Sequence, residues 1–295
     1  MPGFTVMNTE PMTLGGHGRL SGMYTLSPFV WKCDEIYHLL LRAVPRRDDE
    51  PRLKIAEIWY GVGADGLRFE MDEGPLIFPG PDAWDLDGCE DPTVFSEGGM
   101  TYVWYSGLSA AESVGRLLRA SGKDIRSLKK DGVVLDSTTS CANPKEATVI
   151  RSGDGRWRLF FELARQGASH IGLVEAGGPD GPWHPREARI EARDGAWDNW
   201  HLSTGPIIGQ QSEAPTMFYN GAGPAANWRI GWATYNRDYS DVTARSDQPL
   251  ITPPKRDDGG TDIAFAASAV EDGDDVWLYY SLADKAIMRA HLRRT

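Results

Sequence analysis

The stretch Gly88-Cys89-Glu90-Asp91-Pro92-Thr93-Val94-Phe95 begins one copy of a pattern that the chain repeats five times. In each copy a short apolar segment leads through a polar turn into a second strand rich in aromatic and aliphatic residues. The second strands are Tyr37–Ala43, Tyr102–Gly107, Trp157–Glu162, Thr216–Gly221 and Trp277–Ser281. Aligned on Arg42, Ser106, Glu162, Asn220 and Ser281, they recur at roughly 60 residues, a period typical of β-propeller blades.

The repeat predicts an all-β, five-bladed β-propeller that forms a single domain over residues 1–295. The expected blades cover residues 20–85, 86–140, 141–200, 201–260 and 261–295. The last copy stops after its third strand. By analogy with other propellers, we expect residues 1–20 to close the ring by supplying its outer strand, which leaves few exposed sheet edges.

Composition restricts the partners. The formal charge of −11 argues against nucleic acid and anionic membranes, which both need a basic patch. It is compatible with a small neutral carbohydrate or glycoside. The eleven Trp and ten Tyr fit packing between sheets, and some of them fit a sugar site, where a flat ring stacks on C–H groups. The oligomeric state stays open.

The sequence gives no indication of a cofactor or metal. Cys33, Cys89 and Cys141 have no metal-ligand spacing and form no disulfide framework. The segment Gly61–Gly66 matches the dinucleotide pattern G-x-G-x-x-G, but no helix is expected after it. The first ten residues lack the features of a signal peptide, so a cytoplasmic enzyme is expected.

Carboxylates interrupt the repeat at one position. The first strand of each blade should line the central channel, with its leading residue toward the axis. Those leading residues are Ser27, Asp91, Glu146, Gly205 and Ala267. Two carboxylates beside one pocket are what acid–base hydrolysis of a glycosidic bond requires. The alternative is that Asp91 and Glu146 cap turns or hold a cation.

A third carboxylate, Glu162, ends its strand after two Phe residues. Burial there would raise its pKa, which suits a general acid, unless it pairs with Arg158 or Arg165. Four further polar residues lie at inner positions or in nearby loops. They are Arg42, His201, Arg229 and Asp284.

Several short motifs resemble, in order and spacing, those of glycoside hydrolase family 130, over roughly residues 25–292. They include Ser27-Pro28, Glu90-Asp91-Pro92, Asn143–Ala147, Thr204–Pro206, Phe218–Gly221 and Tyr279–Asp284. The resemblance implies a five-bladed propeller, related to families 43 and 32, and a β-mannoside phosphorylase or hydrolase.

The resemblance also implies roles for single residues. Asp91 matches the general acid of the family, and Arg42 and Asp284 match residues that line the glycosyl subsite. Lys145 and His201 match part of the phosphate site of the phosphorylases. Substrate contact is expected at Asn220, where the family usually has His.

Two other positions depart from the phosphorylase pattern, which has Arg at Thr93 and Arg near Glu162. Phosphorolysis needs several cationic donors for a dianion, so these departures favour hydrolysis.

The resulting hypothesis is an inverting glycoside hydrolase for a β-mannoside or similar glycoside. Asp91 protonates the leaving oxygen, directly or through a sugar hydroxyl, and Glu162 or Glu146 activates water. The acid and base carboxyls should then lie about 6.5–9.5 Å apart. The alternatives are a glycoside phosphorylase, and a propeller that binds a ligand without hydrolysis or was recruited to another reaction.

Overall fold

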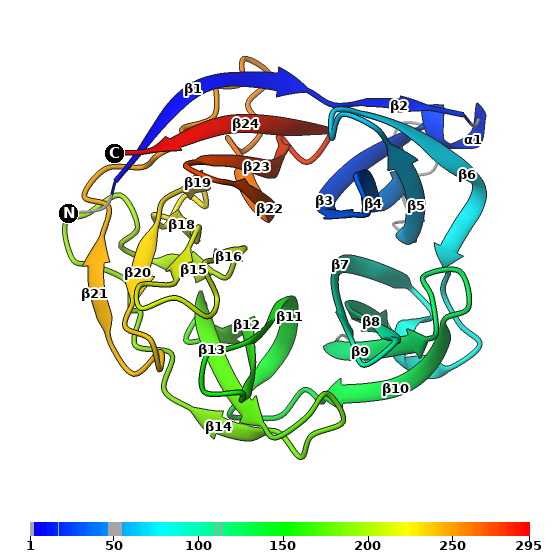
Figure 1. Cartoon of the computed structure of the whole chain (residues 1–295), viewed down its shortest axis with the longest axis horizontal. Coiled ribbons are helices and arrows are strands. Elements are labelled where there is room, and N and C mark those ends of the chain that lie inside the picture. Colours follow the sequence, from blue (N-terminus) through cyan, green and yellow to red (C-terminus); the bar gives the residue numbers. More distant parts are fainter. Residues whose placement is uncertain (1–2, 17, 47–54, 110, 113) are drawn as a thin grey trace.

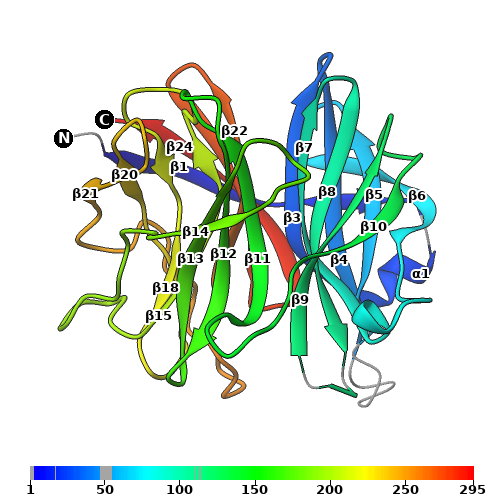
Figure 2. The same ribbon diagram turned by 90° about the horizontal axis from the view of Figure 1, so that it is seen from below.

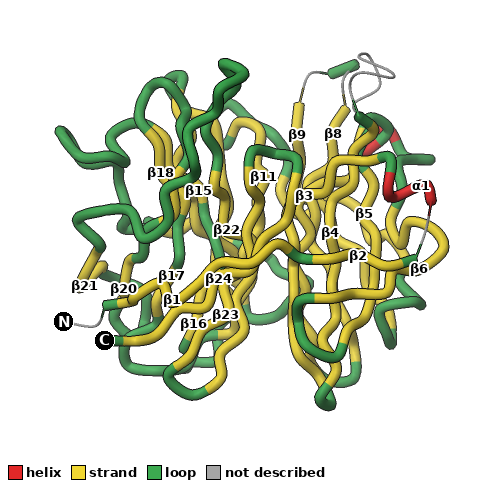
Figure 3. The backbone as a smooth tube through the Cα atoms, turned by 90° about the horizontal axis from the view of Figure 1, so that it is seen from above, coloured by secondary structure: helices red, strands yellow, loops and turns green. Residues whose placement is uncertain are grey.

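The computed structural model describes residues 3–16, 18–46, 55–109, 111–112 and 114–295. In this part of the chain the only helices are α1 (Gly18–Ser21) and the short 3-10 helix η1 (Ala83–Asp85). The remaining regular structure is β-strand, arranged as blades around a central axis (Figures 1 and 3). The expected all-β propeller is therefore confirmed.

Each of the first three blades is a single sheet, with its outer strand named first below. The first blade contains β2 (Thr13–Gly15), β6 (Arg68–Ile77), β5 (Glu57–Gly63), β4 (Ile36–Pro45) and β3 (Met23–Cys33). The second contains β10 (Lys129–Leu135), β9 (Val114–Gly122), β8 (Met100–Ser109) and β7 (Gly88–Glu97). The third contains β14 (His184–Arg186), β13 (Ala168–Ala176), β12 (Trp157–Arg165) and β11 (Ala142–Arg151).

The fourth blade is split into two small sheets. One contains β15 (His201–Ser203), β18 (Asn220–Ala222) and β19 (Arg229–Ile230). The other contains β16 (Ile207–Ile208), β17 (Thr216–Met217), β20 (Ala233–Tyr235) and β21 (Val242–Arg245). Pro206 lies between β15 and β16, and because proline has no N–H it cannot donate to a continuous ladder.

The fifth blade joins the two ends of the described chain. Its strands are β1 (Phe4–Pro11), β24 (Ala286–Arg294), β23 (Asp275–Leu282) and β22 (Ala264–Asp272). The N-terminal strand β1 pairs antiparallel with β24, from Phe4 opposite Arg294 to Pro11 opposite Met288. Figure 2 shows the two ends side by side. The next strand, β2, then pairs with β6 of the first blade.

A hydrophobic cluster fills each junction between neighbouring blades. Alternate side chains of one strand supply two junctions, because successive residues of a strand point to opposite faces. In β4, Leu40 packs toward Val103 of the second blade, whereas Leu39 packs toward Tyr279 of the fifth. The fully buried Trp59, Trp104 and Trp157 belong to these clusters. These three aromatic side chains therefore hold blades together.

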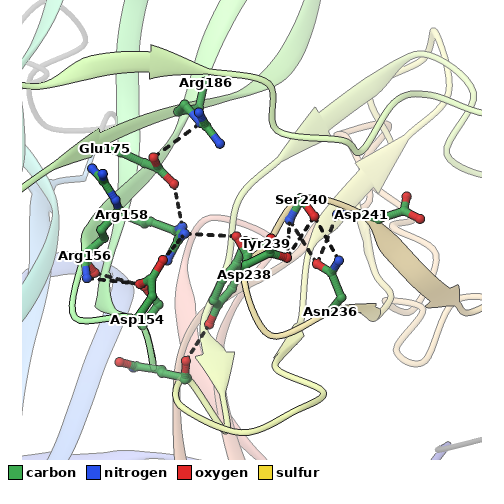
Figure 4. A network of polar contacts seen from close by, with 12 residues as sticks. Asp154, Arg156, Arg158, Glu175, Arg186, Asn236, Asp238, Tyr239, Ser240 and Asp241 are labelled. Carbon is green, nitrogen blue, oxygen red and sulfur yellow. Dashed lines mark hydrogen bonds and ion pairs between the residues drawn. The ribbon is translucent and has the colours of Figure 1, made fainter.

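An ion-pair network ties the third blade to the fourth (Figure 4). Arg158 of β12 is almost fully buried, and its Nη2 donates to Asp154 Oδ2 at 2.9 Å and to the carbonyl of Asp238 at 2.9 Å. Its Nε lies 2.8 Å from Glu175 Oε1, and Arg186 contacts the other oxygen of that carboxylate. Arg158 thus serves this junction and is not the partner of Glu162.

Candidate active site

A β-bulge recurs at the same place in the inner strands of the first three blades. In β3, β7 and β11 the pairing register shifts at Ser27, Asp91 and Glu146. Each of these residues has a positive φ, of 48°, 51° and 53°. Such φ values are uncommon outside glycine, and strained backbone of this kind is often found at functional sites. All three side chains line one pocket of about 220 Å³, here called the central pocket.

In the last two blades, the strand register places the equivalent of Ser27 one residue earlier than the sequence predicted. Ser203 pairs with Asn220, and Phe265 pairs with Ser281, as Leu26 pairs with Arg42. The equivalents of Ser27 are therefore Thr204 and Ala266. The expectation of Gly205 and Ala267 was wrong, because strand pairing, which periodicity does not reveal, sets the position of a bulge.

The second strand of each blade carries one residue of the series Arg42, Ser106, Glu162, Asn220 and Ser281. At some of these positions the side chain forms a hydrogen bond to the next blade. Ser281 Oγ accepts from the Ser27 N–H at 2.8 Å, and Ser106 Oγ accepts from the Glu146 N–H at 3.2 Å. Of the other three members of this series, Asn220 also links two blades, whereas Arg42 and Glu162 are charged and line the central pocket. The site has therefore replaced two of these linking side chains with reactive ones.

Asn220 belongs to the linking group, which corrects its expected contact with substrate. Its Oδ1 accepts from the Ala266 N–H at 2.7 Å. Its Nδ2 donates to the carbonyls of Thr204 and Ala266 at 2.8 and 3.2 Å. The side chain is fully buried and does not line the central pocket. Its amide is occupied in joining the fourth blade to the fifth.

Asp91 is held by two neighbours. Ser27 Oγ donates to Asp91 Oδ1 at 2.7 Å, and Arg42 Nη1 lies 3.4 Å from the same oxygen. Arg42 Nη2 donates to Glu90 Oε1 at 2.5 Å. Burial opposes the charge on Arg42, but the carboxylates around it, including Glu90 and Asp91, raise its pKa. Arg42 is a fixed cation between the first and second blades.

Glu162 has a separate set of partners. Ser169 Oγ donates to Glu162 Oε1 at 2.8 Å, and Lys145 Nζ lies 3.2 Å from the same oxygen. The negative charge of Glu162 raises the pKa of Lys145 above its usual range. His201 supports this arrangement, because its Nδ1 accepts from the Ser169 N–H at 3.1 Å. Burial lowers the pKa of His201, so its ring is neutral near pH 7.

The surroundings of Glu146 favour the protonated form of its carboxyl group. Burial, and then the nearby Asp91, raise the pKa of Glu146 well above its usual range, and Glu162 adds to this effect. Lys145 and Arg42 oppose the shift but do not cancel it. Two carboxyl groups that share a site cannot both ionise easily. Glu146 therefore holds its proton more tightly than an exposed glutamate does.

The central pocket brings together six of the residues that the sequence predicted: Arg42, Asp91, Lys145, Glu146, Glu162 and Asp284. His201 lies behind Ser169 and supports Glu162. Arg229 does not line the pocket. Its neighbour Trp228 does, with Phe265 packed edge-on at a ring-centroid distance of 5.2 Å.

Sequence reasoning placed Ser27 toward the axis without giving it a role, and it missed Glu90 as a pocket residue, although both lie in motifs that it quoted. It also missed Trp228 and Phe265, although it expected aromatic side chains at a sugar site without saying which. Among the described residues, no group of three or more His, Cys, Asp or Glu side chains has the arrangement of a metal site.

Comparison with known proteins decides the family. The sequence profile of glycoside hydrolase family 130, described as β-1,4-mannooligosaccharide phosphorylase, matches residues 46–294. The chain belongs to glycoside hydrolase family 130. It is therefore an enzyme that acts on glycosidic bonds, as the resemblance implied.

Relatives with named activities are distant. The chain is 22% identical to a 1,2-β-oligomannan phosphorylase of Thermoanaerobacter over 85% of its own length and 84% of the relative. It is 24% identical to a β-1,2-mannobiose phosphorylase of the same source, with the same coverage. The family 130 relatives thus include proteins that are named for small oligosaccharide substrates.

Solved structures share the fold. The β-1,2-mannobiose phosphorylase of Listeria innocua superimposes with a TM-score of 0.77 at 18% identity, over 97% of this chain and 91% of that one. Another structure, from work on family 130 glycoside hydrolases that target β-1,2-mannosidic linkages in Candida mannan, gives 0.75 at 19%, over 91% and 84%. In the described part of this chain no helix has the length and apolar character needed to cross a membrane.

Proposed function

We propose that this member of family 130 is an inverting glycoside hydrolase that acts on a β-mannoside or a similar small glycoside. The observation that carries the proposal is the pairing of Glu162 with Lys145 inside the central pocket. A phosphorylase must hold a phosphate dianion beside the sugar, and cationic donors do this best. Here the lysine that would serve phosphate is already paired with a carboxylate.

The charge balance of the pocket supports the same conclusion. Its carboxyl groups are Glu90, Asp91, Glu146, Glu162 and Asp284, and its cations are Arg42 and Lys145. Even with Glu146 and the proposed acid Asp91 both protonated, the other three carboxylates outnumber the two cations. Thr93, where the phosphorylase pattern has Arg, is buried and supplies no charge. Electrostatic repulsion would therefore disfavour phosphate but not water.

The contacts also favour one division of roles. Asp91 donates a proton to the leaving oxygen, directly or through a sugar hydroxyl. Glu162 takes a proton from the attacking water, while Ser169 and Lys145 hold its Oε1 in place. The raised pKa of Glu146 favours its protonated form, so Glu146 is less suited than Glu162 to be that base.

The sugar ring would be oriented by the remaining pocket residues. Arg42 and Asp284 offer a donor and an acceptor for hydroxyl groups. Trp228 and Phe265 offer flat apolar faces for the C–H groups of a ring. These contacts are chemically suited to a neutral monosaccharide unit.

Product analysis with and without phosphate tests the proposal. With β-1,2-mannobiose as substrate, a hydrolase releases mannose at the same rate in both buffers, and no mannose 1-phosphate forms. Asp91→Asn and Glu162→Gln should each lower kcat by about 10²–10⁴-fold, because proton transfer contributes that much to catalysis. The control variant is Glu73→Gln, because Glu73 is exposed. Asn220→Asp would not serve as a control, because Asn220 has a structural role.

Phosphorolysis is the second candidate, because it is the activity for which the relatives are named. The presence of Lys145 and Arg42 in the pocket is the feature that favours it. Sugar 1-phosphate that forms only when phosphate is supplied would establish this activity and reject hydrolysis.

A further inference from the structure

A second cavity adjoins the central pocket. It has a volume of about 420 Å³ and shares Leu26, Arg42, Ile263 and Asp284 with the central pocket. Its other walls include Tyr24 of the first blade and Lys285, which lies in the turn between β23 and β24 of the fifth. We call it the side groove. A ligand in the central pocket can extend into it past Arg42 and Asp284.

A strained turn separates the two cavities. Ala283 and Asp284 follow β23 with consecutive φ values of +54° and +52°, although neither is glycine. The turn is held by the Lys285 N–H, which donates to the Leu282 carbonyl at 3.1 Å, and by the Ala283 N–H, which donates to the Ile263 carbonyl at 2.9 Å. Left-handed backbone is unfavourable for alanine, and such strain is often kept where it orients a functional side chain.

The result of this turn is a defined placement of two side chains. Asp284 lines both cavities, whereas Lys285 lines only the side groove of these two. Lys285 Nζ lies 5.6 Å from the centre of the Tyr24 ring and 4.0 Å from Asp258 Oδ2. Arg256 forms a two-point contact with the same aspartate, through Nε at 2.8 Å and through Nη2.

The chemistry of the side groove suits a neutral polar ring. An aromatic face and several hydrogen-bonding groups meet there. Each cation in its wall is paired with a carboxylate: Arg256 and Lys285 contact Asp258, and Arg42 contacts Glu90 and Asp91. The size of the cavities points the same way. The central pocket and the side groove, of about 220 and 420 Å³, adjoin each other, so a ligand that fills the central pocket has further space beside it.

We propose that the side groove is the subsite for the leaving sugar, with Tyr24 and Lys285 as its specificity-determining residues. This inference rests on the proposed function. The substrate is then a disaccharide or a short oligosaccharide whose terminal ring enters the central pocket. The next ring lies against Tyr24, and Lys285 donates hydrogen bonds to its hydroxyl groups.

Two substrates with different leaving groups test this subsite. β-1,2-Mannobiose has a leaving sugar, whereas β-mannosyl fluoride has the same glycone and a leaving group too small to reach Tyr24. Lys285→Met should lower kcat/KM for the disaccharide about tenfold and leave the value for the fluoride unchanged, because it removes donors that contact only the leaving sugar. Tyr24→Leu should give the same split. Lys255→Met is the control, since Lys255 is exposed and lies outside both cavities.

The outcomes separate the two proposals. Suppose that the wild type hydrolyses both substrates. If Lys285→Met and Tyr24→Leu then change kcat/KM for the two substrates to the same extent, or change neither value, the subsite proposal is wrong and the proposed hydrolase activity remains. If the wild type hydrolyses neither, the proposed function is wrong and the subsite falls with it. Thermal unfolding of each variant, which should match that of the wild type, shows that the disaccharide effect is not a loss of folded protein.

Discussion

Arg42 and Glu162 occupy repeat positions at which Ser106, Asn220 and Ser281 accept backbone hydrogen bonds from the next blade. A charged side chain at such a position does not form this hydrogen bond, so one connection between blades is lost. The propeller tolerates this twice, and both sites line the central pocket. The electrostatic asymmetry of the site therefore starts from two single-residue departures from the repeat.

Glu146 gives a prediction at the residue scale. Its raised pKa means that the folded state holds the proton more tightly than the unfolded chain, in which Glu ionises near 4.3. This contribution to stability is complete below the unfolded pKa and is lost as pH rises through the folded pKa. The Tm of Glu146→Gln minus that of the wild type should therefore increase from about pH 5 to about pH 9.

The measurement is thermal unfolding of both proteins across that pH series. Glu73→Gln, at an exposed glutamate, serves as the control, and its difference from the wild type should stay flat. Parallel curves for Glu146→Gln and the wild type would show that the proton on Glu146 contributes nothing to stability.

Strand pairing, at the scale of elements, places the catalytic candidates. The bulges in β7 and β11 direct Asp91 and Glu146 into the pocket, and the hairpin between β23 and β24 does the same for Asp284. Blade-to-blade contacts then fix the distances. Ser27 and Asp91 are 64 residues apart in sequence, but a hydrogen bond joins their side chains directly.

The contact between β12 and the fourth blade gives a prediction at this scale. Arg158→Ala removes a cation that is 2% exposed and leaves Glu175 buried with Arg186 as its remaining partner (Figure 4). Breaking one side of a buried ion pair costs about 3–5 kcal/mol of unfolding free energy, and we expect a loss toward the lower end of this range.

The double variant Arg158→Met with Glu175→Leu should lose less than the single variant, because it leaves no buried charge without its partner, and the charges that lose a partner, Asp154 and Arg186, are far more exposed than Glu175. Urea unfolding of the wild type and both variants measures the difference. A double variant less stable than Arg158→Ala would show that the network stabilises the junction through its specific geometry.

At the scale of the whole molecule, the ring depends on β1. This strand pairs with β24 along its length, and Phe4 also packs edge-on against Phe218 of the fourth blade at a centroid distance of 4.9 Å. Residues 3–11 thus complete the fifth blade and contact the fourth. We propose that the chain unfolds as a single domain because each blade packs on two others.

Deletion of residues 1–11 tests this proposal. The deletion exposes the edge of β24 and removes Phe4 from the hydrophobic cluster between the last two blades. We expect the Tm of the whole protein to fall in one cooperative transition. The measurement is circular dichroism combined with calorimetry. An unchanged Tm, or a second transition that appears for the fifth blade alone, would contradict it.

The fold was predictable because its signals are local. Alternating side chains, aromatic second strands and polar turns repeat within each blade, and each copy can be recognised without knowing its neighbours. The presence of carboxylates at one repeated position of the inner strands, Asp91 and Glu146, was visible for the same reason. Thr204 and Ala266 were misplaced by one residue because a bulge adds a residue to one strand and shifts the pattern.

By itself, the sequence determined an all-β propeller and the chemical groups available for its site. Only the tertiary structure decided which groups meet. It paired Glu162 with Lys145, tied Asp91 to Ser27, assigned Asn220 to a junction and brought Trp228 and Phe265 to the pocket wall. The physical reason is that periodicity sets the face on which a residue lies within its strand. The ring closure and the register between strands set its partners in other blades.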